Sequence, residues 1–381
     1  KKSEVEKSEY DAFYQEKFGD FAPPQSMVTV SAEGQVSYKA LLFIPSRPPF
    51  DFNSVDYERG LQLYSSGVMI MDKCADLIGE HFSFVKGVVD SPDLSLNISR
   101  ELLQHDRQLK LIANNIDKKI KGELERMIKE DREGYEKFFK TFGRQLKVGC
   151  LNNYGAKKDF LQDLLLFYSS TEKKMVTLSE YVDRMSEDQK IIYYATGENL
   201  AAMDNLPQTE LLRERGIEIL YLTEPMDDML MGILREYKEK TFRSAIDGDL
   251  ELDDTSSEEN NDAHKDAFDF IKEALGEAVD EIRVSKKLKT HPVCLTAGDG
   301  MSFDMERYFN AVQPELGMKA KRILEINVEH AAFAALENAR VSDPEKAKKY
   351  ATVLLNQAKL IAGLPIDDPS GYTDLLCSLW N

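Results

Sequence analysis

The pattern of hydrophobic and polar residues divides the first third of the chain into a short helix, several strands and a long helix. Helical spacing of apolar residues marks 3–19. The first two of the following β-rich runs are joined by a short turn segment and predict a hairpin. Strands are expected at 27–31, 36–44, 68–71 and 84–89, with a helical stretch between the last two. The long helix follows, with apolar positions at Leu102, Leu109, Ile112, Ile116, Ile120 and Leu124. Residues 1–131 are therefore predicted to form one α/β domain.

A second domain is predicted over 132–246. Two helices are expected in its first half, one on Phe138, Phe142 and Leu146 and one on Phe160, Leu164 and Phe167. Short apolar strands at 191–196 and 217–223 flank a helix near 199–203. This strand–helix–strand order predicts a small parallel crossover.

The composition changes at 247–266, where nine acidic residues stand against one lysine. Such a stretch, almost free of large apolar residues, is typical of a linker or mobile loop. A third domain, 267–381, is expected to begin with a helix at 268–275 and a strand at 281–288 and to end in helices. The predicted fold class is therefore α/β (α+β), multi-domain.

Charge and cysteine content narrow the class of protein. The net charge of −18 repels phosphate backbones, so no nucleic-acid partner is expected. No apolar run approaches the roughly 18 residues of a membrane span, so no membrane partner is expected either. Four scattered cysteines without CxxC spacing are typical of reduced thiols, which predicts a cytoplasmic location. The chain opens on a charged segment without an initiator Met, so we expect a fragment of a longer protein.

No catalytic motif is present in the sequence. Neither GxxxxGK[ST] nor GxGxxG occurs, no serine lies in a GxSxG elbow, and the five histidines never pair at metal-ligand spacing. The chain alone is therefore expected to bind neither ATP nor metal and to be inactive as an enzyme. Residue pattern alone indicates an acidic, cytosolic, multi-domain α/β protein.

One run of 23 residues, FSFVKGVVDSPDLSLNISRELLQ at 82–104, resembles the middle-domain signature of the Hsp90 chaperones almost residue for residue. Weaker matches to the same family, of bacterial type, cover 47–51, 185–198, 216–228, 301–309 and the last two helices. The resemblance implies an α-β-α middle domain in two subdomains, followed by a mixed C-terminal domain that ends in a helical dimerisation element. It also implies an ATP-binding domain outside these residues, which would hold ATP and Mg in the full-length protein.

The resemblance gives a role to three residues of the middle domain. From the sequence alone, Arg100 in the first turn of the long helix is a solvated or ion-paired arginine. The matching family arginine contacts the γ-phosphate of ATP, as arginine fingers do. Gln104, one helical turn later, matches its supporting residue. Phe50 matches an apolar contact of the same arrangement, with core packing as the alternative.

A methionine and aromatic stripe follows Gly300. Met301, Met305, Tyr308 and Phe309 recur at helical spacing, and core packing is one interpretation of them. Methionines and aromatics also suit an adaptable surface for varied partners. The family resemblance implies that this helix contacts unfolded or partly folded client proteins. It implies a second client contact at Asp228 and Met229, although the bacterial members carry tryptophan at the position of Met229.

Two terminal helices are predicted, the first starting near 343 and the second after Asp368-Pro369. They could close the core of one protomer, but the resemblance implies a homodimer interface. The expected interface residues are Ala351, Leu354, Ala358, Ile361, Tyr372, Leu375, Leu376, Leu379 and Trp380.

Two functions remain open from the sequence. The first is an ATP-dependent chaperone represented by its middle and C-terminal domains. The alternative is a non-enzymatic, acidic, dimeric scaffold that binds proteins without nucleotide chemistry. The sequence upstream of Lys1 would separate them, because only the chaperone requires an ATP-binding domain there.

Overall fold

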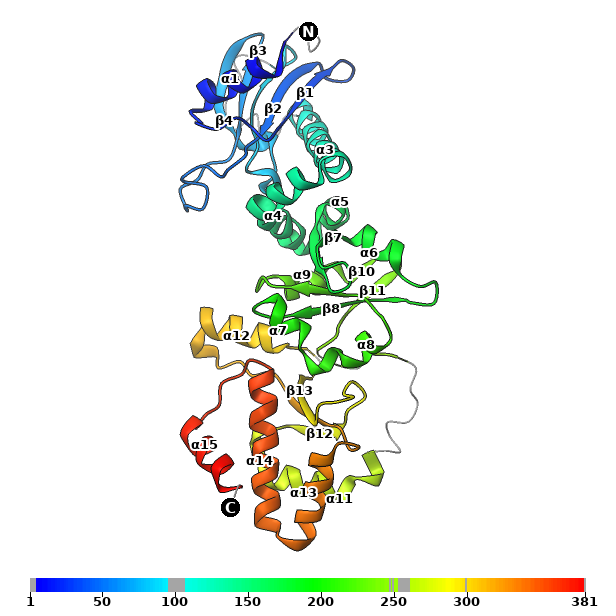
Figure 1. The fold of residues 1–381 in the computed structure, drawn as a ribbon. Coiled ribbons are helices and arrows are strands. Elements are labelled where there is room, and N and C mark those ends of the chain that lie inside the picture. Colours follow the sequence, from blue (N-terminus) through cyan, green and yellow to red (C-terminus); the bar gives the residue numbers. More distant parts are fainter. Residues whose placement is uncertain are drawn as a thin grey trace. The chain divides into compact units, whose positions relative to one another are not determined.

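The computed structural model describes residues 5–94, 107–246, 248, 250–252, 261–298 and 300–379. The chain divides into two compact units, and each mixes helices with strands (Figure 1). The first unit comprises 1–166 and 177–179, and the second comprises 167–176 and 180–381. The mixed α/β, multi-domain class predicted from the sequence is therefore confirmed.

The first unit is built on a five-stranded sheet of order β1-β2-β5-β3-β4, in which β3 runs parallel to β5 and the other neighbours are antiparallel. The predicted hairpin is confirmed as β1 and β2, paired from Ser26↔Ile44 to Ala32↔Tyr38. The strands are β1 (Ser26–Ala32), β2 (Tyr38–Ile44), β3 (Leu61–Ser65), β4 (Val68–Cys74) and β5 (Lys86–Asp90). The helices are α1 (Lys7–Phe18), α3 (Arg107–Glu130), α4 (Arg132–Gly155) and α5 (Lys158–Leu161), with 3-10 turns at Ala75–Leu77, Glu80–Phe82 and Gln162–Leu164. The helical stretch expected between β4 and β5 is thus two short 3-10 turns.

Helices cover both faces of this sheet. Successive side chains of a strand point to opposite faces, so Tyr38 and Phe43 of β2 lie on different sides. The Tyr38 hydroxyl donates a hydrogen bond to Asn115 of α3 at 2.8 Å. The Phe43 ring packs against Tyr14 of α1, with ring centroids 5.1 Å apart. The first unit therefore has α1 on one face of the sheet and α3 on the other.

An aromatic cluster holds α4 against the segment that leads into strand β5. The rings of Phe84 and Phe142 stack at 4.7 Å, and Phe138 lies 5.2 Å from Phe84. All three side chains are buried. Helices α3 and α4 therefore belong to the same compact unit. The domain boundary predicted from the sequence, between residues 131 and 132, falls between these two helices. The ranges 1–131, 132–246, 247–266 and 267–381 stay a prediction, and much of the third lies outside the described residues.

The second unit contains a six-stranded sheet of order β10-β11-β8-β9-β6-β7. Its strands are β6 (Leu166–Ser169), β7 (Met175–Thr177), β8 (Ile191–Thr196), β9 (Ile219–Leu222), β10 (Glu236–Tyr237) and β11 (Lys240–Ser244). Its helices are α6 (Leu178–Arg184), α7 (Leu200–Asp204), α8 (Glu210–Glu214) and α9 (Asp227–Leu234), with a 3-10 turn at Pro207–Thr209. Strands β8 and β9 are parallel, which confirms the predicted crossover through α7.

One predicted helix of this region is wrong. The sequence pattern predicts one helix with Phe160, Leu164 and Phe167, but α5 ends at Leu161 and Phe167 lies in strand β6. Residues 164–167 are all buried. A short apolar run buried on every side fits helical and strand spacing equally well, so periodicity could not separate them.

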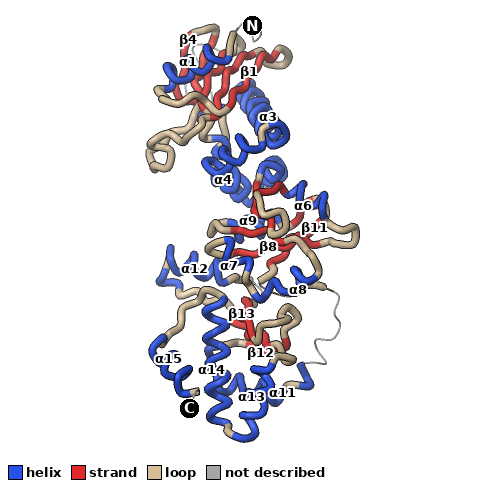
Figure 2. The backbone as a smooth tube through the Cα atoms, in the orientation of Figure 1, coloured by secondary structure: helices blue, strands red, loops and turns tan. Residues whose placement is uncertain are grey.

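The last part of the second unit has a three-stranded sheet of order β12-β14-β13, surrounded by helices (Figure 2). The strands are β12 (Glu281–Val284), β13 (Val293–Ala297) and β14 (Arg322–Ile326). The helices are α11 (Lys265–Leu275), α12 (Phe303–Val312), α13 (Ala331–Ser342), α14 (Pro344–Ile361) and α15 (Pro369–Ser378), with 3-10 turns at Gly276–Ala278 and Pro314–Leu316. The core of this part lies between the sheet and helices α11, α13 and α14.

Polar contacts join the part of the second unit that contains the six-stranded sheet to the part that contains the three-stranded sheet. The Glu210 carboxylate accepts hydrogen bonds from the backbone N–H groups of Lys289 at 2.6 Å and Thr290 at 2.9 Å, and lies 2.5 Å from His291 Nδ1. Burial opposes ionisation of Glu210, but these hydrogen bonds outweigh it and lower its pKa to about 2. The carboxylate is therefore a fixed anionic link between α8 and the loop before β13.

Candidate functional site

Helix α12 is held on its inner face by an apolar and a charged contact. Ser302 caps the helix, because its Oγ accepts a hydrogen bond from the Met305 N–H at 3.1 Å. Phe303 and Glu306, three residues apart on one face, are buried. The Glu306 carboxylate accepts hydrogen bonds from the Ala320 N–H at 2.6 Å and from Arg322 at 2.7 Å.

The predicted methionine and aromatic stripe lies mostly away from that inner face. Tyr308 is 38% exposed, Met305 and Phe309 are half-buried, and the Tyr308 and Phe309 rings lie 5.7 Å apart. Met301, before the helix, packs partly against the core. Val312 continues the exposed side with 58% exposure. The stripe is therefore a partly open apolar surface rather than a core face, apart from Met301.

Asp228 lies against the start of α12. Its carboxylate accepts a hydrogen bond from the Ser302 hydroxyl and another, at 3.4 Å, from the Tyr194 hydroxyl. Burial, reinforced by the negative charge of Asp304, raises the pKa of Asp228, and the hydrogen bonds oppose this shift only in part. Met229, next on α9, is half-buried. The structure thus brings the two predicted client-contact regions, 74 residues apart at Asp228 and Ser302, into direct contact.

A cleft lies between α12 and the carboxyl ends of parallel strands β8 and β9, the edge where open α/β sheets hold ligands. It consists of two adjoining cavities of about 430 Å³ and about 240 Å³. The two cavities share a wall formed by Thr196, Gly197, Glu198, Asp304 and Arg307. Tyr308 and Asp228 line the larger cavity.

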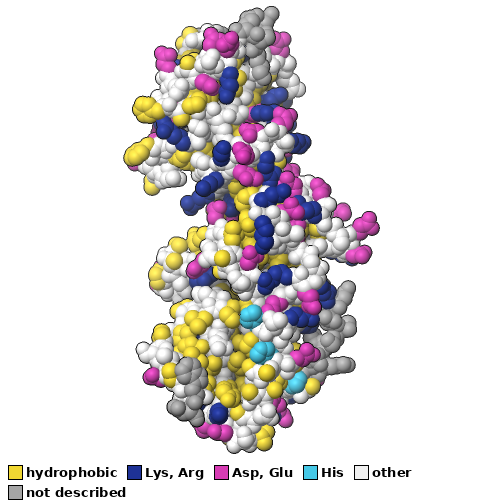
Figure 3. Space-filling model, viewed as in Figure 1, with side chains coloured by type: hydrophobic (Ala, Val, Ile, Leu, Met, Phe, Trp, Pro, Cys, Tyr) yellow, Lys and Arg dark blue, Asp and Glu magenta, His cyan; other side chains and the backbone are white. Residues whose placement is uncertain are grey.

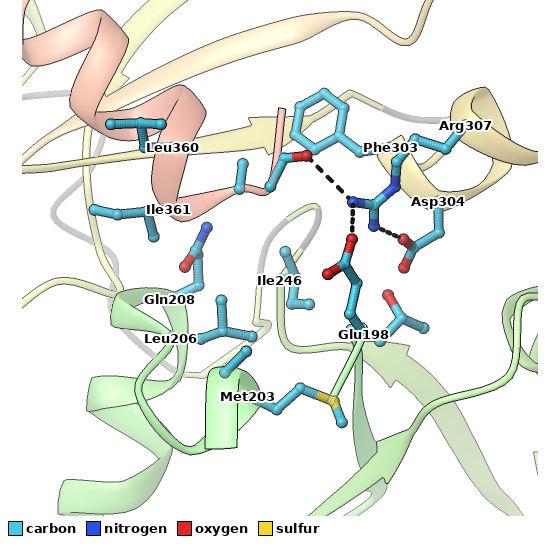
Figure 4. A pocket seen from close by; sticks show the side chains of 15 residues that line it. Glu198, Met203, Leu206, Gln208, Ile246, Phe303, Asp304, Arg307, Leu360 and Ile361 are labelled. Carbon is cyan, nitrogen blue, oxygen red and sulfur yellow. Dashed lines mark hydrogen bonds and ion pairs between the residues drawn. The ribbon is translucent and has the colours of Figure 1, made fainter. Parts of the chain in front are cut away.

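The polar residues of the shared wall were not found from the sequence. The Arg307 guanidinium donates hydrogen bonds to Asp304 and, at 3.3 Å, to the Gly363 carbonyl, and lies 4.0 Å from Glu198 (Figure 4). The parallel crossover already predicted at 191–223 was the available signal, because it places the loop with Glu198 at the carboxyl end of a strand. That signal does not predict that α12 closes the cleft.

The structure places only one of the three residues predicted to act on ATP. Arg100 and Gln104 lie outside the described residues. Phe50 is fully exposed in the loop before β3, so core packing does not explain it. Phe52, two residues later, is buried against Phe142 with the ring centroids 5.6 Å apart. The loop is therefore anchored through Phe52 and presents Phe50 to solvent.

The predicted interface residues fall into two groups. The first group is buried in the core of the protomer and consists of Ala351, Leu354 and Ala358. This face of α14 therefore packs within its own chain. The others are half-buried or, for Trp380, outside the described residues; the half-buried ones are Ile361, Tyr372, Leu375, Leu376 and Leu379. None of the ten residues of α15 is buried. Figure 3 shows hydrophobic side chains gathered over α14 on this face of the molecule.

No group of three or more His, Cys, Asp or Glu side chains is placed to hold a metal ion among the residues whose positions are described. Within the same part of the chain, no helix is both long and apolar enough to cross a membrane.

Comparison with known proteins finds relatives that match nearly the whole chain. Residues 1–380 match the protein family described as "Hsp90 protein". The chain is 52% identical over 382 residues to "Chaperone protein HtpG" of Bacillus subtilis (strain 168), and equally to the protein of that name from Alkaliphilus oremlandii. The HtpG of Clostridium acetobutylicum is 52% identical over 380 residues. Each match covers 99% of this chain but 61% of the relative, so the chain spans about three fifths of the length of these relatives.

Proposed function

The chain belongs to the Hsp90 family, and from that premise we propose that it is the client-binding and dimerising part of an ATP-dependent molecular chaperone. The observation that carries the proposal is helix α12. Its inner face is fixed by Phe303 and Glu306, while Met305, Tyr308 and Phe309 stay partly open to solvent. A soluble protein that keeps such side chains at its surface usually uses them for binding.

The chemistry of the stripe fits varied, partly unfolded partners. Methionine is flexible and polarisable, and tyrosine offers an apolar ring with a polar end, so the same surface can pack against different apolar segments. The Asp228–Ser302 hydrogen bond holds the start of α12 against α9. The helix is therefore positioned rigidly while its exposed side chains remain adaptable.

Replacing Met305, Tyr308 and Phe309 together by serine is expected to weaken binding of an unfolded protein about tenfold or more. Each lost apolar contact contributes on the order of 1 kcal/mol when partly buried, and about 1.4 kcal/mol changes an affinity tenfold. The measurement is fluorescence anisotropy with labelled, reduced and carboxymethylated α-lactalbumin. Serine at Phe21 and Val68, two exposed apolar residues of the first unit, is the matched control and should leave the affinity unchanged. Equal affinity of the triple variant, or its unfolding in circular dichroism, would refute the assignment of the stripe.

We also propose that the longer protein hydrolyses ATP with Mg and that Arg100 and Gln104 act on the γ-phosphate. The family resemblance of 82–104 and the exposed, anchored Phe50 loop support this role. In a chain that includes the ATP-binding part, Arg100→Ala is expected to slow turnover about tenfold or more, because an arginine finger stabilises the charge of the transferred phosphoryl group. ATP affinity should stay within about twofold. Arg107→Ala, at the exposed start of α3, is the control. Unchanged turnover in Arg100→Ala would refute the role assigned to Arg100.

Homodimerisation through the terminal helices is the third part of the proposal. An amphipathic helix of ten residues is marginal by itself and gains stability by packing. In α15 the apolar side is only half-covered by its own protomer. A second copy related by a two-fold axis would cover the same leucines on both chains.

A further inference from the structure

The smaller cavity of the cleft, about 240 Å³, has a mainly apolar wall. The lining comes from five separate segments: the loop after β8, α7 with the turn after it, the segment just after β11, the start of α12, and the end of α14 (Figure 4). The apolar wall consists of Ala202, Met203, Leu206, Ile246, Phe303, Leu360 and Ile361. Glu198 and Arg307 lie on the side shared with the larger cavity.

One buried polar group interrupts the apolar wall. Gln208 is 0% exposed, and its amide lines the cavity near Leu206 and Ile361. Its Nε2 donates a hydrogen bond to the Leu295 carbonyl at 3.2 Å. This bond fixes the orientation of the amide, since the reversed amide would set two oxygens against each other. Among the described residues, none donates a hydrogen bond to Gln208 Oε1.

A buried acceptor without a partner is unfavourable and is normally satisfied by protein, water or ligand. Water is a poor partner in this position. An ordered buried water needs two to four polar partners. Met203, Leu206, Phe303 and Ile361 offer none, and the polar side chains that line the cavity, those of Thr196, Glu198, Asp304 and Arg307, belong to the wall shared with the larger cavity. A molecule with an apolar body and one hydrogen-bond donor matches both the wall and Gln208 Oε1.

We propose that this cavity binds a small aromatic molecule that carries a single N–H donor. The ring would lie against Met203, Phe303 and Ile361, and the N–H would donate to Gln208 Oε1. The volume corresponds to roughly eight liquid water molecules, so one fused bicyclic ring is the size that fits. The inference is independent of client binding, because it uses neither the exposed stripe nor ATP.

The probe pair is indole and benzofuran, which have nearly the same shape but differ in the donor: benzofuran carries an oxygen where indole carries N–H. Binding is followed through the ¹³C-labelled δ1 methyl groups of isoleucine, because Ile246 and Ile361 both line the cavity. We expect both of these methyl signals to shift with indole, and indole to bind about tenfold more tightly than benzofuran, as expected when a buried acceptor loses its donor.

Two variants test the residues that carry the inference. Gln208→Leu removes the acceptor, so benzofuran should bind at least as tightly as indole while both still enter the cavity. Ala202→Trp adds a large side chain at a position that is exposed yet lines the cavity, and should abolish binding of both probes without disturbing the core. This second variant decides the matter if Gln208→Leu does not fold.

Four results would overturn the proposal: shifts that miss Ile246 and Ile361, equal affinity of the two probes for the wild-type chain, an indole preference that survives in Gln208→Leu, or indole binding that survives in Ala202→Trp. Client affinity measured in parallel keeps the two proposals separate. Loss of probe binding in Ala202→Trp with unchanged client affinity would support the cavity alone.

Discussion

Substituting Leu375 and Leu376 together by alanine is expected to convert a homodimer into a folded monomer. Both leucines lie on α15, where no residue is buried by its own chain. Full burial of a leucine side chain contributes roughly 1.5–3 kcal/mol. In a two-fold interface each substitution occurs twice. The dissociation constant should therefore rise by at least about a hundredfold, because about 1.4 kcal/mol corresponds to a factor of ten.

Sedimentation equilibrium at low micromolar concentration measures this change, with circular dichroism to verify the fold. The monomer should stay folded because the cores of both units are formed without α15. Leu316→Ala, at an exposed leucine outside the terminal helices, should remain dimeric. A monomeric parent chain would contradict the proposed interface. So would a double variant that is still dimeric at the same concentration.

Replacing Glu325 by alanine is expected to lower the free energy of unfolding by about 3–5 kcal/mol, the usual effect of breaking a buried ion pair. Glu325 on β14 is 2% exposed and accepts hydrogen bonds from Arg283 at 2.5 Å and from Ser285 at 3.0 Å. Lys287 is equally buried nearby and donates to the Ile246 carbonyl at 2.9 Å. Without Glu325, the buried Lys287 and the partly exposed Arg283 lose their counter-charge.

The same carboxylate gives stability a defined pH dependence. Burial opposes ionisation of Glu325, but Lys287 and Arg283 outweigh it and hold its pKa below the ordinary value. A group with a depressed folded-state pKa stabilises the protein above its unfolded pKa, near 4.5, and this contribution is lost as the pH falls through the folded value. Wild-type stability should therefore fall below about pH 4.5, and the Glu325→Gln variant should lack that part of the slope.

Urea denaturation at several pH values tests both statements. Glu315→Ala, at an exposed glutamate after α12, is the control and should change stability by less than about 0.5 kcal/mol. If Glu325→Ala costs no more than this control, or if Glu325→Gln keeps the full acid slope, the buried cluster does not have the role assigned to it.

Local pattern was enough to predict much of the fold. The hairpin β1–β2 and the parallel pair β8–β9 follow from short runs with clear strand chemistry and turn residues. Strand β3 was missed, although its buried and half-buried residues alternate and only Ser66 and Gly67 separate it from β4. Its place beside β5 depends on pairing with a strand more than twenty residues away.

The candidate site shows a similar limit. Helical spacing predicted the stripe of α12, but the Asp228–Ser302 and Gln208–Leu295 bonds join residues 74 and 87 positions apart. No local pattern encodes such contacts. The spacing of apolar residues also does not predict which face of the terminal helices packs against the core of its own protomer. Ala351 and Ala358 have the same periodic character as Leu375, yet only the alanines are buried in the protomer core.

Site-specific photocrosslinking can show whether α12 presents a binding surface to non-native proteins. A photoreactive benzoylphenylalanine is placed at Tyr308 in one protein and at Tyr154 in another, since Tyr154 is a fully exposed tyrosine of the first unit. Each is irradiated with reduced and carboxymethylated α-lactalbumin. We expect abundant crosslinks from position 308 and few from position 154. Equal yields from the two positions, or none from 308, would contradict this expectation.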